Sequence, residues 1–102
     1  MNNFDEKKEA YNLAIFLKHQ CRINEEEFGE ILTEFFNAVN IYENTAGMET
    51  FFDNLLYRRE IKAYRYVALQ KIYDFYKKVR QIRDYDVFKE LKEAIKKVPS
   101  LQ

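Results

Sequence analysis

Hydrophobic residues recur every three or four positions along most of the chain, which is the spacing of one face of an α-helix. The first such segment runs from Phe4 to Cys21, and its regular positions are Ala10, Leu13, Ala14, Leu17 and Cys21. Ile15 and Phe16 lie outside that face. We therefore expect a helix that is apolar around most of its circumference and more buried than the others.

A second amphipathic segment extends from Asn24 to about Tyr42. Asn24 is a favourable N-cap, and the acidic residues Glu25–Glu27 that follow suit the positive end of a helix dipole. Glu27 also occupies the position of a capping-box carboxylate. The apolar stripe contains Phe28, Ile31, Leu32, Phe35, Phe36, Val39 and Tyr42, and glutamates fill the opposite side. The pattern predicts a helix with one face in the core.

The stretch from Met48 to Arg83 follows a predicted turn at Asn44–Gly47 and contains no glycine or proline. A single helix of this length would measure about 54 Å, whereas a domain of this size has a radius of gyration near ~13 Å. The apolar stripe also changes phase along the stretch. We predict a break near Tyr57–Glu60, with one long helix that buries two faces as the alternative.

A last amphipathic segment, Val87–Val98, is preceded by the capping sequence Asp84-Tyr85-Asp86 and closed by Pro99. The whole pattern predicts an all-α fold, a compact antiparallel bundle of four to five helices. Residues 1–102 are expected to form a single domain, since the length suits one hydrophobic core. Two glycines and one proline in 102 residues provide too few turns for an all-β fold.

Charge is distributed unevenly, although Lys and Arg together balance Asp and Glu over the full chain. Residues 1–50 carry ten acidic and four basic side chains, a net charge of −6, and residues 51–102 carry seven acidic and thirteen basic ones, a net charge of +6. The two halves could pair within one molecule. They could also pair between copies, so a homodimer is an alternative.

The most basic stretch, residues 57–83, has nine basic and two acidic side chains, with tyrosines among them. Arg and Tyr dominate binding hot spots, and the Arg guanidinium grips carboxylates and phosphates. The predicted core stripe of this stretch includes Tyr57, Tyr64 and Ile82. Seven of the nine cations, further tyrosines and Leu69 project on the opposite side. The candidate partner-binding residues are Arg58, Arg59, Lys62, Arg65, Tyr66, Tyr73, Tyr76 and Arg80. Alternatively, this face packs beneath the other helices and the arginine heads extend to solvent.

Signals for catalysis are almost absent. Two isolated glycines, Gly29 and Gly47, cannot build a phosphate-binding loop. His19 and Cys21 are two positions apart and would point in different directions on a helix. A single histidine cannot supply the paired ligands of a di-metal bundle. We expect no enzyme activity, no catalytic residue, no metal and no cofactor.

The single cysteine excludes an internal disulfide, and no membrane span or signal peptide is visible, so a cytoplasmic location is expected. In size and outline the chain resembles the small four-helix immunity proteins of bacteriocin producers and the small helical inhibitors of phages and plasmids. That resemblance is one of architecture only. The predicted function is binding of a protein with an acidic surface, as a regulator, inhibitor or immunity-type protein. Nucleic-acid binding through the same residues is the alternative, and a membrane surface ranks below both.

Overall fold

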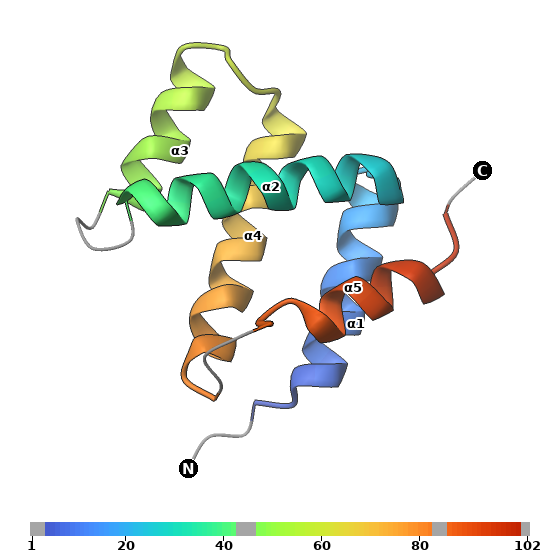
Figure 1. Ribbon diagram of the computed structural model, residues 1–102. Coiled ribbons are helices and arrows are strands. Elements are labelled where there is room, and N and C mark those ends of the chain that lie inside the picture. The colour runs from blue at the N-terminus through green and yellow to red at the C-terminus, as the bar shows by residue number, and fades with distance from the viewer. Residues whose placement is uncertain (1–3, 43–46, 83–85, 101–102) are drawn as a thin grey trace.

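The computed structural model describes residues 4–42, 47–82 and 86–100, which form five α-helices and one π-helical turn (Figure 1). Those residues contain no strand, so the predicted all-α fold is confirmed. The elements are α1 (Glu6–Ile15), η1 (Phe16–Gln20), α2 (Glu25–Tyr42), α3 (Met48–Tyr57), α4 (Ala63–Arg80) and α5 (Lys89–Lys97).

The helices pack as a bundle in which α3 and α4 form an antiparallel hairpin and α2 crosses over α4 (Figure 1). The helix α1 lies beside α4 and runs in the opposite direction, while α5 packs against α1. The radius of gyration is 13.4 Å, close to the ~13 Å of a compact chain of this length.

The first predicted helix, Phe4–Cys21, consists of α1 followed directly by η1. The Asp5 carboxylate caps α1 by accepting the Lys8 amide at 3.2 Å. In η1 the Cys21 amide donates to the Phe16 carbonyl, five residues back, at 3.1 Å, which is the wider spacing of a π-helix. Arg22, with φ of 58°, then turns the chain out of the helix.

The helix α2 begins where the sequence predicts, because the Asn24 side chain caps it. Its Oδ1 accepts the Glu27 amide at 2.7 Å. The predicted stripe faces the core for Phe28, Ile31, Leu32, Phe35 and Val39, which are all buried. Phe36 and Tyr42, at the edges of the stripe, remain partly accessible.

The predicted break between α3 and α4 is confirmed, and its cause is a complete C-capping motif. The Glu60 amide donates to the Leu55 carbonyl at 2.9 Å, and the Arg59 amide to the Leu56 carbonyl at 3.0 Å. These are the two bonds of the Schellman motif, which requires a left-handed residue just after the helix. Arg59 adopts that conformation, with φ of 62°.

The core centres on Phe35, whose side chain is fully buried. Its ring lies 5.2 Å from Tyr76, 5.5 Å from Phe88 and 6.4 Å from Phe52, measured between ring centroids. These rings come from α2, α4, the residue before α5, and α3, so one aromatic cluster joins four parts of the chain. Pairs of aromatic rings in such arrangements add ~0.5–1.5 kcal/mol each beyond the burial of their area.

The last helix starts two residues later than predicted. Phe88 occupies the N-cap position of α5, and Val87 and Phe88 lie in a turn before it. Both side chains are buried in the core. The Asp86 carbonyl accepts the Lys89 amide at 3.1 Å, so Asp86 contributes to the start of α5 through its backbone. Its φ is 50°, in the left-handed region. The other predicted capping residues, Asp84 and Tyr85, and positions 44–46 of the predicted turn lie outside the described residues.

Candidate functional site

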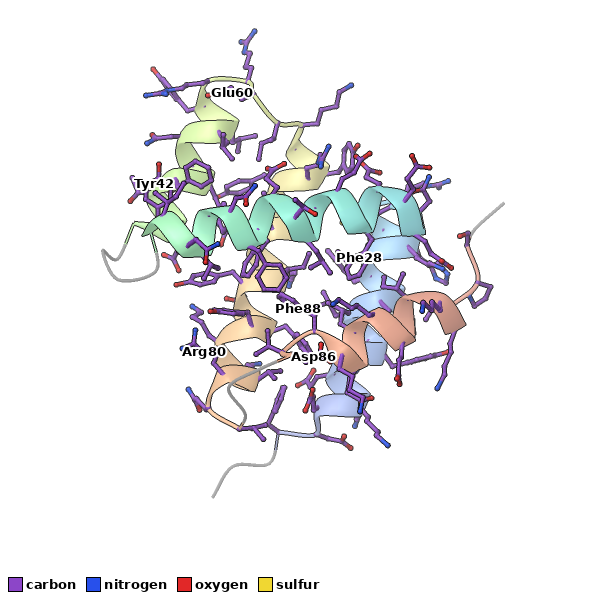
Figure 2. The ribbon with its side chains drawn as sticks, viewed as in Figure 1. Phe28, Tyr42, Glu60, Arg80, Asp86 and Phe88 are labelled. Carbon is purple, nitrogen blue, oxygen red and sulfur yellow. The ribbon has the colours of Figure 1, made fainter. Side chains whose placement is uncertain are left out.

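The eight candidate partner-binding residues do not form one continuous face. The break between α3 and α4 separates Arg58, Arg59 and Lys62 from the body of α4, which is about 27 Å long. Figure 2 shows Glu60, in the break, and Arg80 at opposite ends of α4. The remaining five candidates fall into three groups. Two contact α2 or α3, two pack in or against the core, and Arg80 lies at the C-terminal end of α4.

Arg65 and Tyr66, near the start of α4, make contacts within the molecule. The Arg65 guanidinium lies 3.6 Å from the Glu34 carboxylate of α2. The Tyr66 hydroxyl donates to Asp53 of α3 at 2.5 Å, and this hydrogen bond raises the pKa of Tyr66. Tyr64 similarly donates to Glu27 at 2.5 Å, which raises the pKa of Tyr64. These side chains connect helices, as the alternative interpretation of the face expects.

Tyr76 belongs to the core, and Tyr73 is partly buried and packs against it. Tyr76 is buried, and the ring of Tyr73 lies 6.1 Å from that of Phe52. Leu69, also predicted to point outward, is fully buried. The prediction that these three side chains project away from the core is wrong. The helix α3 packs along that flank of α4. The buried part of the α4 surface is therefore wider than the predicted core stripe and extends toward α3.

Three other side chains depart from the prediction in the opposite direction. Tyr57, Tyr64 and Ile82 were expected on the core stripe, yet they are exposed by 87%, 36% and 51%. Tyr57 ends α3, and Ile82 follows α4, so neither continues the α4 face. When one continuous helix is assumed across a break, the calculated angular positions place residues beyond the helix ends on the wrong face.

Arg80, at the C-terminal end of α4, is exposed and lies over a buried aromatic ring. Its Cζ is 5.4 Å from the centroid of Tyr76, and its Nη1 donates to the Tyr76 hydroxyl. A cation over an aromatic face is attracted by the ring quadrupole. Tyr76 thereby positions the guanidinium at the surface, directly above the aromatic cluster of the core.

Two hollows of about 330 and 370 Å³ lie beside this pair and share Val39, Tyr76 and Arg80 as lining residues. We call them together the Arg80 groove. Figure 2 shows Arg80, Asp86 and Phe88 on the same part of the molecule, where the end of α4 meets the start of α5. The other lining residues are Phe36, Asn40, Met48, Tyr73, Lys77, Gln81, Asp86, Val87, Phe88 and Lys92.

The Arg80 groove is lined by aromatic and aliphatic side chains together with polar and charged ones. Among the described residues, Lys77, Arg80 and Lys92 line it, against one carboxylate from Asp86. The Lys77 ammonium lies 4.5 Å from the Tyr73 ring centroid, and it also lies 3.7 Å from the Asp74 carboxylate and 3.9 Å from the Glu49 carboxylate. In protein interfaces, arginine and tyrosine side chains beside well-packed pockets are enriched among the residues that contribute most to binding.

Sequence reasoning missed most of this groove. Its floor comes from α2, α3 and the start of α5, and only Tyr73, Tyr76 and Arg80 were among the candidates. Phe36 provided one signal: it lies at the edge of the α2 stripe and is 39% exposed, while its ring packs on Phe88. The participation of Lys92 depends on how α5 docks, which no local pattern encodes.

A third hollow, of about 260 Å³, lies between α1 and α4 and has balanced charges. Lys71 and Lys78 line it, but so do Glu9 and Asp74. The ammonium of Lys71 lies 5.3 Å from the Phe16 ring centroid. With two cations and two carboxylates around it, this hollow favours neither sign of ligand charge.

The side chains considered for chemistry take structural positions. Cys21 is buried, and burial raises the pKa of its thiol, with Glu27 adding to the effect. His19 Nε2 lies 2.9 Å from the Pro99 carbonyl. Among the described residues there is no group of three or more His, Cys, Asp or Glu side chains placed to hold a metal ion. In the same part of the chain, no helix has the length and apolarity needed to cross a membrane.

Comparison with protein-family models, with curated proteins and with solved structures gives no match for this chain. The functional argument therefore depends on the geometry of the Arg80 groove.

Proposed function

We propose that the protein is a non-enzymatic binding protein that docks an acidic protein partner in the Arg80 groove. The observation that carries the proposal is the position of Arg80, held over the Tyr76 ring between two hollows that apolar and polar side chains line together. A partner carboxylate would meet the guanidinium, and apolar side chains of the partner would enter the hollows. A regulator, inhibitor or immunity-type protein acts by such a contact.

The energetic basis is the combination of burial and charge. Hot spots in protein interfaces are enriched in Arg and Tyr, and they lie in pockets from which the partner excludes water. A guanidinium next to apolar surface is desolvated together with its carboxylate partner, and such hydrogen bonds are about twice as strong as neutral ones. The groove supplies both elements from residues that the folded core already fixes in place.

The test is capture of partners from a lysate of the native host, with and without nuclease, using variants that reverse charge at two places. Lys77→Glu/Arg80→Glu alters the groove. Arg58→Glu/Lys62→Glu makes the same change in charge at the other end of α4 and is the matched control. Circular dichroism and thermal unfolding establish that both variants are folded.

We expect one protein to be captured by the wild type and by the control variant and lost with the groove variant, with or without nuclease. Removal of a hot-spot side chain costs at least ~2 kcal/mol, a loss of affinity of roughly thirtyfold. Lys92→Glu, on α5, is a second groove variant that leaves Arg80 and its contact with Tyr76 intact. We expect it to weaken binding as well. Equal capture by the wild type and both groove variants would refute the proposal, and loss of all captured protein with nuclease would favour nucleic acid.

A further inference from the structure

The connection between α3 and α4 carries a second concentration of positive charge, far from the Arg80 groove. We call residues 57–62 the α3–α4 tip. It contains Arg58, Arg59 and Lys62, all exposed, and one acidic residue, Glu60. Tyr57, at 87%, is the most exposed large hydrophobic side chain among the described residues. Figure 1 shows this connection at the outer end of the α3–α4 hairpin, away from α5.

The backbone of the tip is fixed by hydrogen bonds rather than loosely connected. The amides of residues 58, 59 and 60 all donate to carbonyls of the last turns of α3, at 2.9–3.0 Å. The tip also holds an arginine at a left-handed position, where glycine is the usual residue. The chain thus presents a cation at a position where the backbone favours a residue without a side chain.

Two acidic side chains near the start of α4 have partners outside the tip. Glu34 pairs with the guanidinium of Arg65, and Asp53 accepts the hydroxyl of Tyr66 while keeping its negative charge. Within the tip itself, three cations outnumber the single carboxylate of Glu60. The local excess of two positive charges attracts a polyanion, although the whole chain is neutral.

We infer that the α3–α4 tip binds single-stranded nucleic acid, with Tyr57 stacking on a base and the three cations contacting phosphates. Surfaces that bind single strands combine basic side chains with exposed aromatic rings, since every base has a π-face and every nucleotide a phosphate. A duplex offers no unpaired base to Tyr57. A membrane surface fits less well, because binding at the bilayer interface requires apolar side chains such as Trp, Phe or Leu, and Leu55 and Leu56 are already partly buried.

This inference does not depend on the proposed protein binding, because it uses different residues. The experiment measures the fluorescence anisotropy of a labelled oligothymidine of about 12 nucleotides, titrated with the full chain at low salt. We expect the protein to bind the oligonucleotide. A plot of the logarithm of the association constant against the logarithm of the salt concentration should have a slope of about −1.4 to −2.1, the value for two or three neutralised phosphates.

Three variants assign the binding to the tip. Tyr57→Ala is expected to weaken it by at least ~fivefold, the effect of losing one stacked base. Arg58→Glu/Lys62→Glu is expected to abolish it, whereas Lys77→Glu/Arg80→Glu, with the same charge change at the other end of α4, leaves it intact. Absence of binding at low salt would overturn the inference. So would equal loss with both double variants, or binding to anionic lipid vesicles but not to the oligonucleotide.

Discussion

Arg59 provides the sharpest test of the local structure, because its left-handed conformation predicts that glycine at this position stabilises the fold. A side chain with a Cβ in this region costs ~1–2 kcal/mol relative to the right-handed helix. Glycine avoids this cost. However, glycine also gives the unfolded chain more conformational entropy, which offsets ~0.5–1 kcal/mol of the gain in stability. Because φ of residue 59 is 62°, we expect Arg59→Gly to raise the free energy of unfolding by about 0.5–1 kcal/mol.

The matched control is Arg59→Ala, which removes the same charge and keeps the Cβ. For a chain of this size the predicted gain corresponds to an increase in Tm of about 2–8 °C. Urea titration followed by circular dichroism measures both variants against the wild type. Arg59→Gly must be more stable than Arg59→Ala. If the two variants have equal stability, residue 59 does not adopt the left-handed conformation and the account of the helix break is wrong.

The remaining predictions concern the core and the contacts of α4. Phe35→Ala should lower the free energy of unfolding by ~3–5 kcal/mol in urea titration, because the Phe35 ring is fully buried among aromatic rings from three other segments; a loss under ~1 kcal/mol would contradict that packing. Arg65→Met and Glu34→Leu should each destabilise the fold, and the double variant should lose less than the sum, by a coupling of ~0.5–3 kcal/mol; strict additivity would show that the two side chains do not interact. The raised pKa values of Tyr64 and Tyr66 mean that the folded state holds the two hydroxyl protons more tightly than the unfolded state does. The stabilisation of the fold by these hydroxyl groups is therefore complete below the ordinary pKa of 10.0 and is lost as pH rises through the raised pKa values. The difference in Tm between the wild type and Tyr64→Phe/Tyr66→Phe should accordingly shrink above pH 10.0, and a constant difference would argue against both hydrogen bonds.

Local patterns in the sequence were sufficient to predict the helices and most of their ends. The N-cap of α2 follows from Asn24, because a capping side chain acts on an amide three residues away. The break before α4 follows from the change of phase in the apolar stripe. It could be predicted without a glycine, although glycine is the usual residue at such a position and the chain uses Arg59 instead.

Which flank of α4 is buried could not be predicted locally. Tyr73 and Tyr76 lie on the side that α3 and α2 cover, and that packing depends on the direction in which the chain turns after Tyr57. The same limit applies to the Arg80 groove, which brings Phe36, Arg80 and Lys92 together from three helices. Arg80 was a candidate because of its charge, but its place above Tyr76 is a property of the tertiary structure.

Site-specific photocrosslinking tests the central claim, that the Arg80 groove is the docking surface, most directly. A benzophenone amino acid replaces Phe36, whose exposed ring lines the groove, and in a second sample it replaces Val67, which is similarly exposed, at 38%, outside the groove. The two positions differ in location and have nearly equal accessibility. We predict that the captured partner crosslinks to position 36 and not to position 67. Crosslinking at position 67 alone would place the interface elsewhere and contradict the claim.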